Sequence, residues 1–483
     1  MLEFQVIVLA AGKGSRITEL TARKPKCLLP IGNQPMVYYP LKIIEKYGFK
    51  EVFLVVLETA KSEVEFALEK TDLAINVNVV TIPYDCDWGT ADSLRHLASY
   101  IISDFIVVSS DLLTTINVKS ILNFHRKNES SLTAVYLQPN TDVELNFVTP
   151  GTKSKTKIEK DLVGIDPVTK RLVFLASASD YEEVLPIKEK LLRKHGNVRI
   201  YTNLLDAHFF VMKKWLIKYL TFDKNLTTVK GELIPYVLKK QMSRDNKLPS
   251  LIDISPEISP MNHQNEKKTV DIFLLAKDLD YDILAKTLSS YNDHTGDLNP
   301  VYLNDNIKCY SYITKEFGIR TNTLHDFYKA NKTVANYWNK IVEQELIKIS
   351  PESVIESTQF DKETCIVGSM TKIAAKTSIK STIFGTGCVI EQKTRISDCL
   401  IMNNVVVKEG CVISNCIICD DVIIENNCTL TSCLVGSQYT VSSKIDIFLN
   451  SVNNFKINFF FYCRFLGSHK NEILAEIESL MEI

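Results

Sequence analysis

Apolar residues near the end of the chain recur with a fixed offset of 17 residues. Between residues 360 and 441 three such series can be followed, and apolar positions within one repeat lie six residues apart. The series are Ile373, Ile390, Val407, Ile424 and Val441; Val367, Phe384, Ile401, Ile418 and Val435; and Ile379, Ile396, Ile413 and Leu430. Three apolar columns with one residue per coil would fill a triangular prism of parallel strands. The spacing therefore predicts a left-handed parallel β-helix of hexapeptide repeats over 360–441.

Eight of the 12 cysteines lie between Cys365 and Cys433, inside this repeat. Several are also 17 residues apart, so the β-helix would stack them coil on coil. Small residues stacked in the wall and ligands of a metal ion both fit this spacing, and we favour the stacked residues. Cys416 and Cys419 form a CxxC pair, but no second pair or nearby His completes the four ligands of a zinc site. The sequence therefore predicts no metal ion here.

Strand-like and helix-like stretches alternate in the first half of the chain. Apolar β-branched runs predict strands over 5–9, 51–57, 77–82 and 105–109, and helix-like stretches between them include 35–47 and 90–101. This alternation predicts an α/β domain with a mostly parallel, Rossmann-like sheet covered on both faces. Ligands of such sheets bind at the carboxyl ends of the strands, so we expect the functional residues there.

Three segments lie outside these two patterns. Residues 241–272 combine prolines with polar residues, which is typical of a linker or a long surface loop. Residues 273–350 show no decisive periodicity, and we treat them as an adaptor segment that completes one of the flanking domains. The repeat is not recognisable after residue 441, so we predict an atypical C-terminal tail over 442–483. This tail would cap the solenoid, contact a partner, or be sequence that the ordinary product lacks.

The charge of the chain is nearly balanced, which bears on its partners. With 56 basic and 57 acidic residues the net charge is -1, so the chain has no global positive field that would attract nucleic acid or an anionic membrane. No run of about 20 apolar residues is present. The start, Met1-Leu2-Glu3, lacks the positive region of a signal peptide. We therefore expect a cytosolic protein without direct contacts to membrane or nucleic acid.

Glycines and basic residues follow the first predicted strand, in the stretch LAAGKGSRITELTARKPKCLLPIGNQPM. Gly12, Gly14 and Ser15 would let backbone N–H groups approach an anion closely, and Arg16 supplies a planar fork for phosphate. Lys26 adds a second positive charge on a turn fixed by Pro25. A glycine-rich turn of this kind is by itself equally compatible with a purely structural role.

The order of these segments resembles the signature of the sugar-1-phosphate nucleotidyltransferases. Gly89 and Thr90 open GTADSL, which is similar to the family segment that faces the base and sugar of the nucleotide. Asp111 follows a predicted strand as the metal-binding Asp of the family does, and Glu232 opens ELIP, which is similar to its E-x-x-P segment. The resemblance implies a nucleotidyltransferase-like domain over 1–240.

The chemistry implied by this resemblance is attack of a sugar phosphate on the α-phosphate of a nucleoside triphosphate. Cations are needed to stabilise the charge on the phosphate oxygens. By resemblance Arg16 would stabilise pyrophosphate, Lys26 the phosphates, and Asp111 a Mg²⁺ ion. The second carboxylate of the family, in a Trp-x-Asp segment, has no counterpart here, because Thr90, Ile217 and Lys340 follow the three tryptophans at that spacing. We therefore expect an inherited nucleotide fold without catalysis.

Further segments resemble the gamma-subunit family of eukaryotic translation initiation factor 2B. They are GSRITELT, PKCLLPIGNQP, WGTADSLR, LDAH, ELIPY and the terminal LMEI. This resemblance implies a non-catalytic subunit of the guanine-nucleotide exchange factor for initiation factor 2. Its partners would be the catalytic epsilon subunit, the other subunits of initiation factor 2B, and initiation factor 2 itself.

The residues that remain of the nucleotide site would then be vestigial and none of them catalytic. They are Gly12, Gly14, Ser15, Arg16, Lys26, Gly89, Thr90 and Asp111. No cofactor is expected, although a nucleotide or sugar nucleotide would still fit the glycine loop.

Two other functions compete with this one. The alternative is an active GDP-mannose-type nucleotidyltransferase, which the presence of Arg16, Lys26 and Asp111 favours and the missing Trp-x-Asp segment opposes. A β-helix acyltransferase with a histidine base is opposed by the sequence, because no His lies between His325 and His469.

Overall fold

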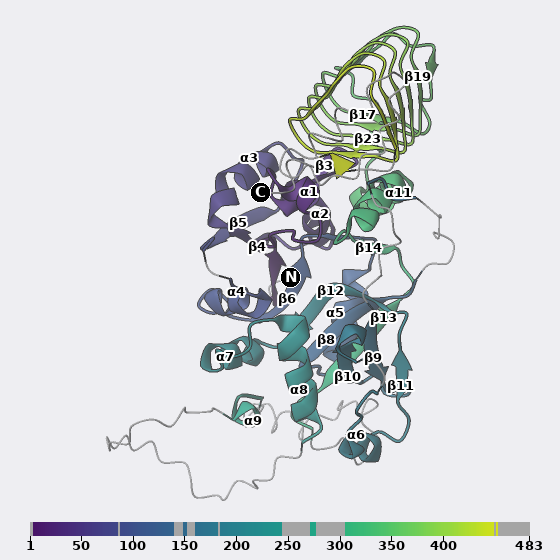
Figure 1. Cartoon of the computed structure of the whole chain (residues 1–483). Coiled ribbons are helices and arrows are strands. Elements are labelled where there is room, and N and C mark those ends of the chain that lie inside the picture. The colour runs from purple at the N-terminus through teal and green to yellow at the C-terminus, as the bar shows by residue number, and fades with distance from the viewer. Residues whose placement is uncertain are drawn as a thin grey trace, which may run out of the picture. The chain divides into compact units, whose positions relative to one another are not determined.

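The computed structural model describes residues 3–85, 87–139, 148–151, 160–181, 184–243, 271–276, 305–448 and 451–452 (Figure 1). The chain divides into two compact units. The α/β unit comprises residues 1–17, 24–145 and 156–345, and the β-helix unit comprises 18–23, 146–155 and 346–483. Within the described ranges, no helix has both the length and the apolar character needed to cross a membrane.

A seven-stranded sheet forms the centre of the α/β unit, in the order β13-β8-β12-β6-β1-β4-β5. Its strands are β1 (Phe4–Leu9), β4 (Glu51–Leu57), β5 (Asn76–Ile82), β6 (Asp104–Ser109), β8 (Leu132–Leu137), β12 (Leu205–Met212) and β13 (Cys309–Thr314). All neighbouring pairs are parallel except those of β12, which is antiparallel to β6 and β8. The four predicted strands and the mostly parallel sheet are thus confirmed.

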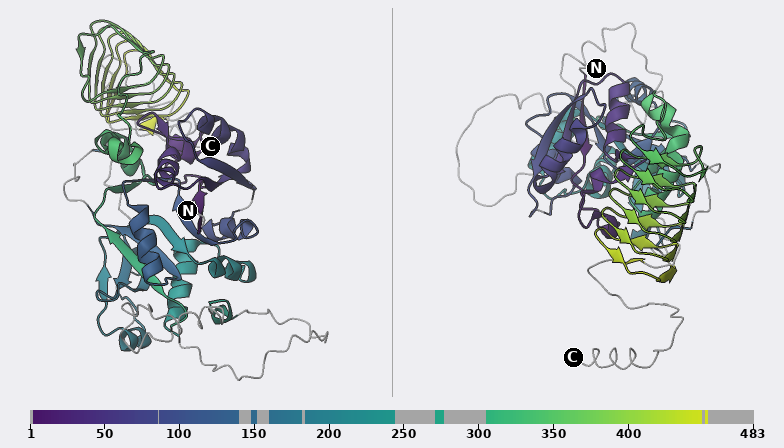
Figure 2. Two further views of the ribbon diagram at one scale, coloured as in Figure 1. Left: turned by 180° about the vertical axis from the view of Figure 1, so that it is seen from behind. Right: turned by 90° about the horizontal axis from the view of Figure 1, so that it is seen from above.

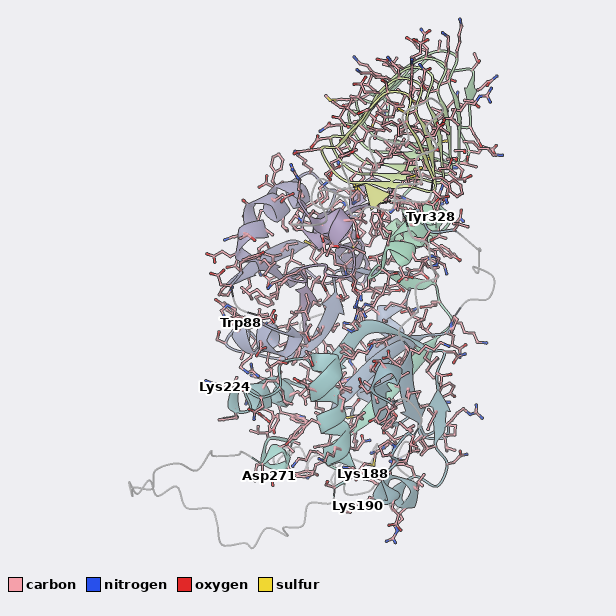
Figure 3. The ribbon with its side chains drawn as sticks, in the orientation of Figure 1. Trp88, Lys188, Lys190, Lys224, Asp271 and Tyr328 are labelled. Carbon is pink, nitrogen blue, oxygen red and sulfur yellow. The ribbon has the colours of Figure 1, made fainter. Side chains whose placement is uncertain are left out.

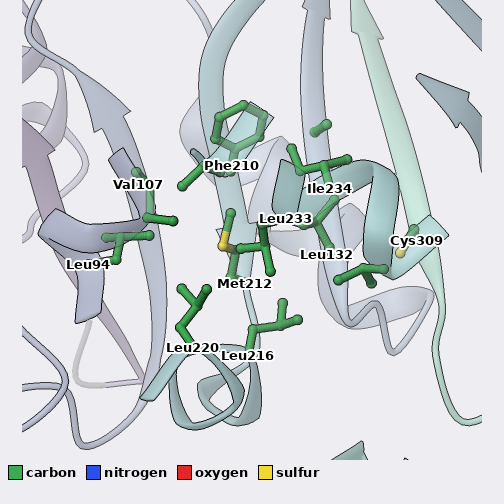
Figure 4. Packing of buried hydrophobic residues seen from close by; sticks show 14 of the residues in the cluster. Leu94, Val107, Leu132, Phe210, Met212, Leu216, Leu220, Leu233, Ile234 and Cys309 are labelled. Carbon is green, nitrogen blue, oxygen red and sulfur yellow. The ribbon is translucent and has the colours of Figure 1, made fainter. Parts of the chain in front are cut away.

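Helices cover both faces of this sheet. Adjacent residues of one strand point to opposite faces. Because both faces are covered, side chains on either face can be buried, and the strands are continuously apolar. Val107 of β6 lies in the core cluster with residues of α4 (Thr90–His96) and α7 (Lys214–Phe222), whereas Val108 lines a small cavity together with Ile43 of α2 (Tyr38–Lys46). Figure 4 shows the first of these faces, where Leu94 and Leu220 lie near Val107.

The helices and short strands complete this unit. The longer helices are α2 (Tyr38–Lys46), α3 (Lys61–Glu69), α4 (Thr90–His96), α5 (Val118–Lys127), α7 (Lys214–Phe222), α8 (Ile234–Gln241) and α11 (Leu324–Val342), and the short ones are α6 (Glu189–Lys194) and α9 (Ile272–Ala276). The small sheets pair β9 (Asp161–Ile165) with β10 (Leu172–Ser177) and β11 (Arg199–Tyr201), β7 (Leu112–Thr114) with β14 (Gly318–Arg320), and β2 (Pro30–Ile31) with β3 (Gln34–Pro35).

The described part of the predicted adaptor segment 273–350 belongs mainly to the α/β unit. Strand β13 joins the sheet beside β8, β14 pairs with β7, and α11 packs against α2. The sequence left open which flanking domain this segment completes, and the structure assigns residues 305–345 to the first. Residues 277–304, and residues 244–270 of the predicted linker, lie outside the described residues.

Three walls of six parallel strands form the β-helix (Figures 1 and 2). The first wall contains β15 (Val354–Ile355), β18 (Lys372–Ile373), β21 (Val389–Ile390), β24 (Val406–Val407), β27 (Ile423–Ile424) and β30 (Thr440–Val441). The second contains β16 (Gln359–Phe360), β19 (Ser378–Lys380), β22 (Arg395–Ser397), β25 (Val412–Ser414), β28 (Thr429–Thr431) and β31 (Asp446–Phe448). The third contains β17 (Ile366–Val367), β20 (Ile383–Phe384), β23 (Leu400–Ile401), β26 (Ile417–Ile418), β29 (Leu434–Val435) and β32 (Ser451–Val452).

The three predicted apolar columns form the interior of this solenoid. Neighbouring strands pair residues 17 positions apart, as in Ile390 with Val407 and Ile396 with Ile413. All members of the three series are buried in one core cluster. The 17-residue period is therefore the length of one coil, and each series runs down one inner wall.

The β-helix extends beyond the predicted range 360–441 at both ends. It begins at β15, where the first coil pairs Val354 with Lys372 and Gln359 with Ser378. These pairs are more than 17 residues apart, so a search for the 17-residue period misses them. It continues to β31 and β32, where Ile447 and Val452 prolong two of the apolar series. The prediction therefore ended the solenoid two strands too early. The other residues of the predicted tail, 449–450 and 453–483, lie outside the described residues.

The cysteines of the repeat are buried, and six of them donate hydrogen bonds to backbone carbonyl oxygens. Sγ of Cys388, Cys411 and Cys428 lies 3.0–3.1 Å from the carbonyl oxygen 14 residues later. The Oγ1 atom of Thr371 makes the same contact with Gly385 at 2.9 Å. Cysteine and threonine thus occupy equivalent corner positions, each as a small side chain with one donor.

A large-to-small substitution on an inner column should destabilise the solenoid. Leu430 is fully buried, so we expect Leu430→Ala to lower the free energy of unfolding by about 2–5 kcal/mol through lost burial and a residual cavity. Thr429→Ala, at the exposed neighbouring position of β28, is the control and should change it by less than about 0.5 kcal/mol. Urea unfolding of both variants tests this, and equal destabilisation would contradict it.

Candidate functional site

The predicted site residues lie at one edge of the main sheet. Strands β1 and β6 are parallel neighbours, with Leu9 paired with Ser109 at their carboxyl ends. The glycine loop follows β1 and Asp111 follows β6, so both reach the edge where ligands of parallel sheets bind. The structure therefore places the glycine loop and Asp111 after the carboxyl ends of neighbouring strands.

The glycine loop is a turn on the surface of the α/β unit. A Cβ atom placed on Gly12 would meet no other atom within 4 Å, and Gly14 adopts a left-handed φ of 72°. The carbonyl of Gly14 accepts a hydrogen bond from the backbone N–H of Ile17 at 2.9 Å, which closes the turn. Ser15 and Arg16 are exposed. The loop therefore has the backbone shape and the exposure that an anion-binding turn needs.

Lys26 and Asp111, in contrast, are buried and bind each other. The Nζ atom of Lys26 lies 2.6 Å from Oδ2 of Asp111 and also donates to Oδ1 of Asn322 at 2.9 Å. Arg320 approaches the same carboxylate, with Nε 3.2 Å from Oδ1 and Nη2 3.5 Å from Oδ2. Asp111 is only 2% exposed. One buried carboxylate is thus held by two cations of the chain itself.

The pairing of β7 with β14 places Arg320 beside Asp111. Strand β7 begins immediately after Asp111, and its first residue, Leu112, is the partner of Arg320 in the antiparallel ladder. The next residue, Thr321, donates to the carbonyl oxygen of Asp111 from its backbone N–H at 2.9 Å and from its Oγ1 at 3.0 Å. The backbone register therefore fixes the guanidinium at the carboxylate.

The electrostatics of this cluster keep Asp111 ionised. Burial alone would raise the pKa of the Asp111 carboxyl, but the charges of Arg320 and Lys26 hold it well below its usual range. Burial would likewise lower the pKa of Arg320, whereas Asp111 and Asp206 raise it. Asp111 and Arg320 are therefore a charged pair at neutral pH.

A second ion pair cluster adjoins the first. Lys230 lies 2.7 Å from Asp161 and 3.4 Å from Asp206, and Nε2 of His208 lies 3.6 Å from Asp206. Burial and the charge of Arg320 lower the pKa of His208 to about 4, so this imidazole is neutral at pH 7. Burial would raise the pKa of Asp206, but His208 and Lys230 lower it.

The charges of the two clusters cancel. Three carboxylates, those of Asp111, Asp161 and Asp206, face three permanent cations. These cations are Lys26, Lys230 and Arg320. The Mg²⁺ ion that the resemblance implies does not fit at Asp111 as the side chains stand, because both carboxylate oxygens are engaged by cations. In the described part of the chain, no group of three or more His, Cys, Asp and Glu side chains is arranged to hold a metal ion.

Gly89 and Thr90 bind a neighbouring turn of the protein. The backbone N–H of Gly89 donates to Asp92 at 3.0 Å at the start of α4, and Oγ1 of Thr90 accepts from the N–H of Val229 at 2.8 Å. A Cβ atom on Gly89 would lie 2.2 Å from the carbonyl oxygen of Thr227. The absence of a side chain at Gly89 thus allows this close approach. Trp88, labelled in Figure 3, precedes it and lies with its ring 5.4 Å from that of His96.

Glu232 of the ELIP segment holds the same turn. Its Oε2 accepts hydrogen bonds from the backbone N–H of Thr227 at 2.5 Å and of Thr228 at 3.0 Å. These bonds lower the pKa of the Glu232 carboxyl. The segment continues through a π-helix over Val229–Leu233 into α8. Two segments that the sequence connected only by resemblance, GTADSL and ELIP, therefore bind the same turn at residues 227–229.

Both parts of the chain match models of known families. Residues 5–147 match the Nucleotidyl transferase model, and residues 343–447 match the EIF2B subunit epsilon LbH domain model. The chain is 28% identical to translation initiation factor eIF2B subunit gamma of Dictyostelium discoideum over 414 residues, which are 80% of this chain and 88% of the relative. It is 34% identical to the gamma subunit of Schizosaccharomyces pombe over 248 residues, 50% of this chain and 53% of the relative. The chain is therefore similar to eIF2B gamma subunits.

The epsilon subunit of eIF2B is similar to this chain as well. The epsilon subunit of Schizosaccharomyces pombe is 26% identical over 209 residues, 42% of this chain and 30% of the relative. The predicted fold class is confirmed, a nucleotidyltransferase domain followed by a left-handed β-helix. The resemblance to gamma subunits, stated from the sequence, is confirmed too.

The sequence reasoning missed several residues of the charge network around Asp111. They are Arg320, Asn322, Asp161, Asp206 and Lys230. Of these, only Asp206 lay in a segment that the sequence singled out, LDAH. Arg320 and Asn322 lie at and beyond the end of a three-residue strand, about 200 positions from Asp111. A strand is recognised in a sequence by the alternation of apolar and polar residues, and a strand of this length is too short to show it.

Replacing Asp111 should destabilise the α/β unit. Asp111→Asn leaves the buried Lys26 and the partly buried Arg320 beside a neutral group, and we expect a loss of about 3–5 kcal/mol in the free energy of unfolding. The pKa of Asp111 is depressed by folding, so its contribution is present above the unfolded pKa of about 3.9 and is lost as the pH falls below that value. Urea unfolding between pH 7 and pH 3 should show a steeper acid loss in the wild type than in the variant. Asp180→Asn, at an exposed acid, is the control.

The two glycines of the site should respond differently to a methyl group. Gly89→Ala places Cβ within 2.2 Å of a backbone oxygen, so the turn at Thr227 must shift and the melting temperature should fall. Gly12→Ala meets no atom within 4 Å and should melt within about 2–4 °C of the wild type. Thermal unfolding of both variants measures the difference, and an unchanged melting temperature for Gly89→Ala would contradict the described contact.

Proposed function

We propose that this chain is a non-catalytic subunit of the eIF2B complex, the guanine-nucleotide exchange factor for initiation factor 2. The observation that carries the proposal is its similarity to a gamma subunit along 80% of the chain, through both the α/β unit and the β-helix unit. In this role it pairs with a catalytic epsilon subunit and joins the other subunits of the complex. Its balanced charge supports protein partners rather than nucleic acid or membrane, and we place it in the cytosol.

The charge network supports a loss of nucleotidyltransferase activity. Phosphoryl transfer needs cations directed at the phosphate oxygens of the substrate. Lys26 donates instead to Asp111 and Asn322, and Asp111 is engaged by two side chains of the protein. The residues of the former nucleotide site then serve the fold, with none of them catalytic. The exposed loop with Gly12, Gly14, Ser15 and Arg16 can still receive a nucleotide or sugar nucleotide without reacting, and no cofactor is required.

The β-helix unit supports a role in assembly. Its sequence matches the model of the epsilon LbH domain, so the proposed partner carries a solenoid of the same kind. The outer surface of the first wall exposes Val354, Val389 and Ile423, which lie in one column. A flat wall with exposed apolar residues is suited to an extended contact with a partner protein.

Two experiments test this proposal. The tagged chain, purified from its source, should bring an epsilon-like subunit with it, and the isolated complex should release GDP from initiation factor 2. Pure chain incubated with GTP, mannose-1-phosphate and Mg²⁺ should form no pyrophosphate. Turnover by a chain that purifies alone would instead identify an active GDP-mannose-type nucleotidyltransferase and contradict the proposal.

A further inference from the structure

We propose that the guanidinium of Arg320 takes the place that a divalent cation would hold at Asp111, so that the α/β unit is metal-independent at this position and excludes the ion. The proposal concerns only the α/β unit and does not depend on the partners of the chain. It rests on where Arg320 comes from, what it touches, and the charges that surround it.

The contacts of Arg320 are those expected of a fixed cation. Its Nε and Nη2 atoms face the two oxygens of Asp111 side-on, at 3.2 and 3.5 Å. An arginine remains charged at every pH at which the protein folds. The Nζ atom of Lys26 also neutralises the Asp111 carboxylate, at 2.6 Å from Oδ2. Both carboxylate oxygens are thereby occupied without any ion from solution.

A second carboxylate also acts on Arg320. Asp206 lies near the start of β12, an antiparallel strand whose first residues reach the same sheet edge as the carboxyl end of β6. Together with Asp111 it raises the pKa of Arg320. A positive charge under the influence of two carboxylates is also the electrostatic arrangement of a divalent metal site. Here a side chain supplies that positive charge.

Arg320 is held in place by its neighbours in sequence. Thr321 donates twice to the carbonyl of Asp111, and Asn322 accepts from Lys26. On the other side, a Cβ atom on Gly318 would lie 2.4 Å from Leu137, so the strand passes close to the end of β8. The β7–β14 ladder therefore anchors the backbone of Arg320 beside Asp111, within reach of the carboxylate.

Removal of the Arg320 charge should create affinity for a divalent ion. The network would then hold three carboxylates against two cations, a net charge of −1, with space left by the guanidinium next to Asp111. Mn²⁺ is the probe, because its binding is followed by electron paramagnetic resonance without any enzymatic assay. We expect Arg320→Gln to bind one Mn²⁺ about tenfold or more tightly than the wild type.

Three matched variants define the site. Arg320→Lys keeps the charge and should not gain Mn²⁺. Arg320→Gln combined with Asp111→Asn should lose the gain, because the ion needs that carboxylate. Arg126→Gln removes an arginine from an exposed pair with Glu3 and should behave as the wild type. Added Mn²⁺ should raise the melting temperature of Arg320→Gln and leave that of Arg126→Gln unchanged.

Two results would overturn the proposal. One is a folded Arg320→Gln variant, checked by circular dichroism, that takes up no more Mn²⁺ than the wild type. The other needs no Arg320 variant and so remains available if that variant does not fold: the wild type itself binds Mn²⁺ at a site that Asp111→Asn abolishes. Neither result bears on whether the chain assembles with an epsilon-like subunit, so the two proposals fail separately.

Discussion

The pairing of one buried carboxylate with a buried lysine and a partly buried arginine links the distant parts of the α/β unit. Asp111 follows a central strand, Lys26 lies in the turn after the glycine loop, and Arg320 arrives from the segment after residue 305. Charges buried without partners are strongly destabilising, so each of the three residues requires the other two. The segment 305–342 is for this reason an integral part of the first domain, with β13 on the main sheet and β14 at Asp111.

The sequence indicated the solenoid well because its repeat is local. One coil takes 17 residues, and each inner column receives one apolar residue per coil, so the pattern can be read without knowing any distant contact. The ends were placed less well for a physical reason. The first coil is longer than 17 residues, and in the last coil Ile447 and Val452 keep the spacing while exposed residues such as Phe448 obscure it. The parallel sheet was predicted for the same reason as the inner columns, from continuous apolar runs.

The candidate site could be located from the sequence, but its internal contacts could not. The glycine loop, Lys26 and Asp111 were all expected at one sheet edge, and they lie there. What neutralises Asp111 depends on a three-residue ladder between residues about 200 positions apart, and short strands leave no periodic pattern. The motif shows which types of residue are present, but their function depends on the side chains that contact them. Here the acid and the lysine face each other, with Arg320 and Asn322 completing their contacts.

The corner cysteines give the solenoid a property that its apolar columns do not. Burial raises the pKa of the Cys388 thiol to about 11 and also raises that of Cys411, so neither is a reactive thiolate at neutral pH. A thiol reagent or an oxidant can reach these sulfur atoms only when the coil around them opens. The rate at which each corner is alkylated would then report how often that coil unwinds, so the cysteines form a built-in series of probes for fraying along the solenoid axis.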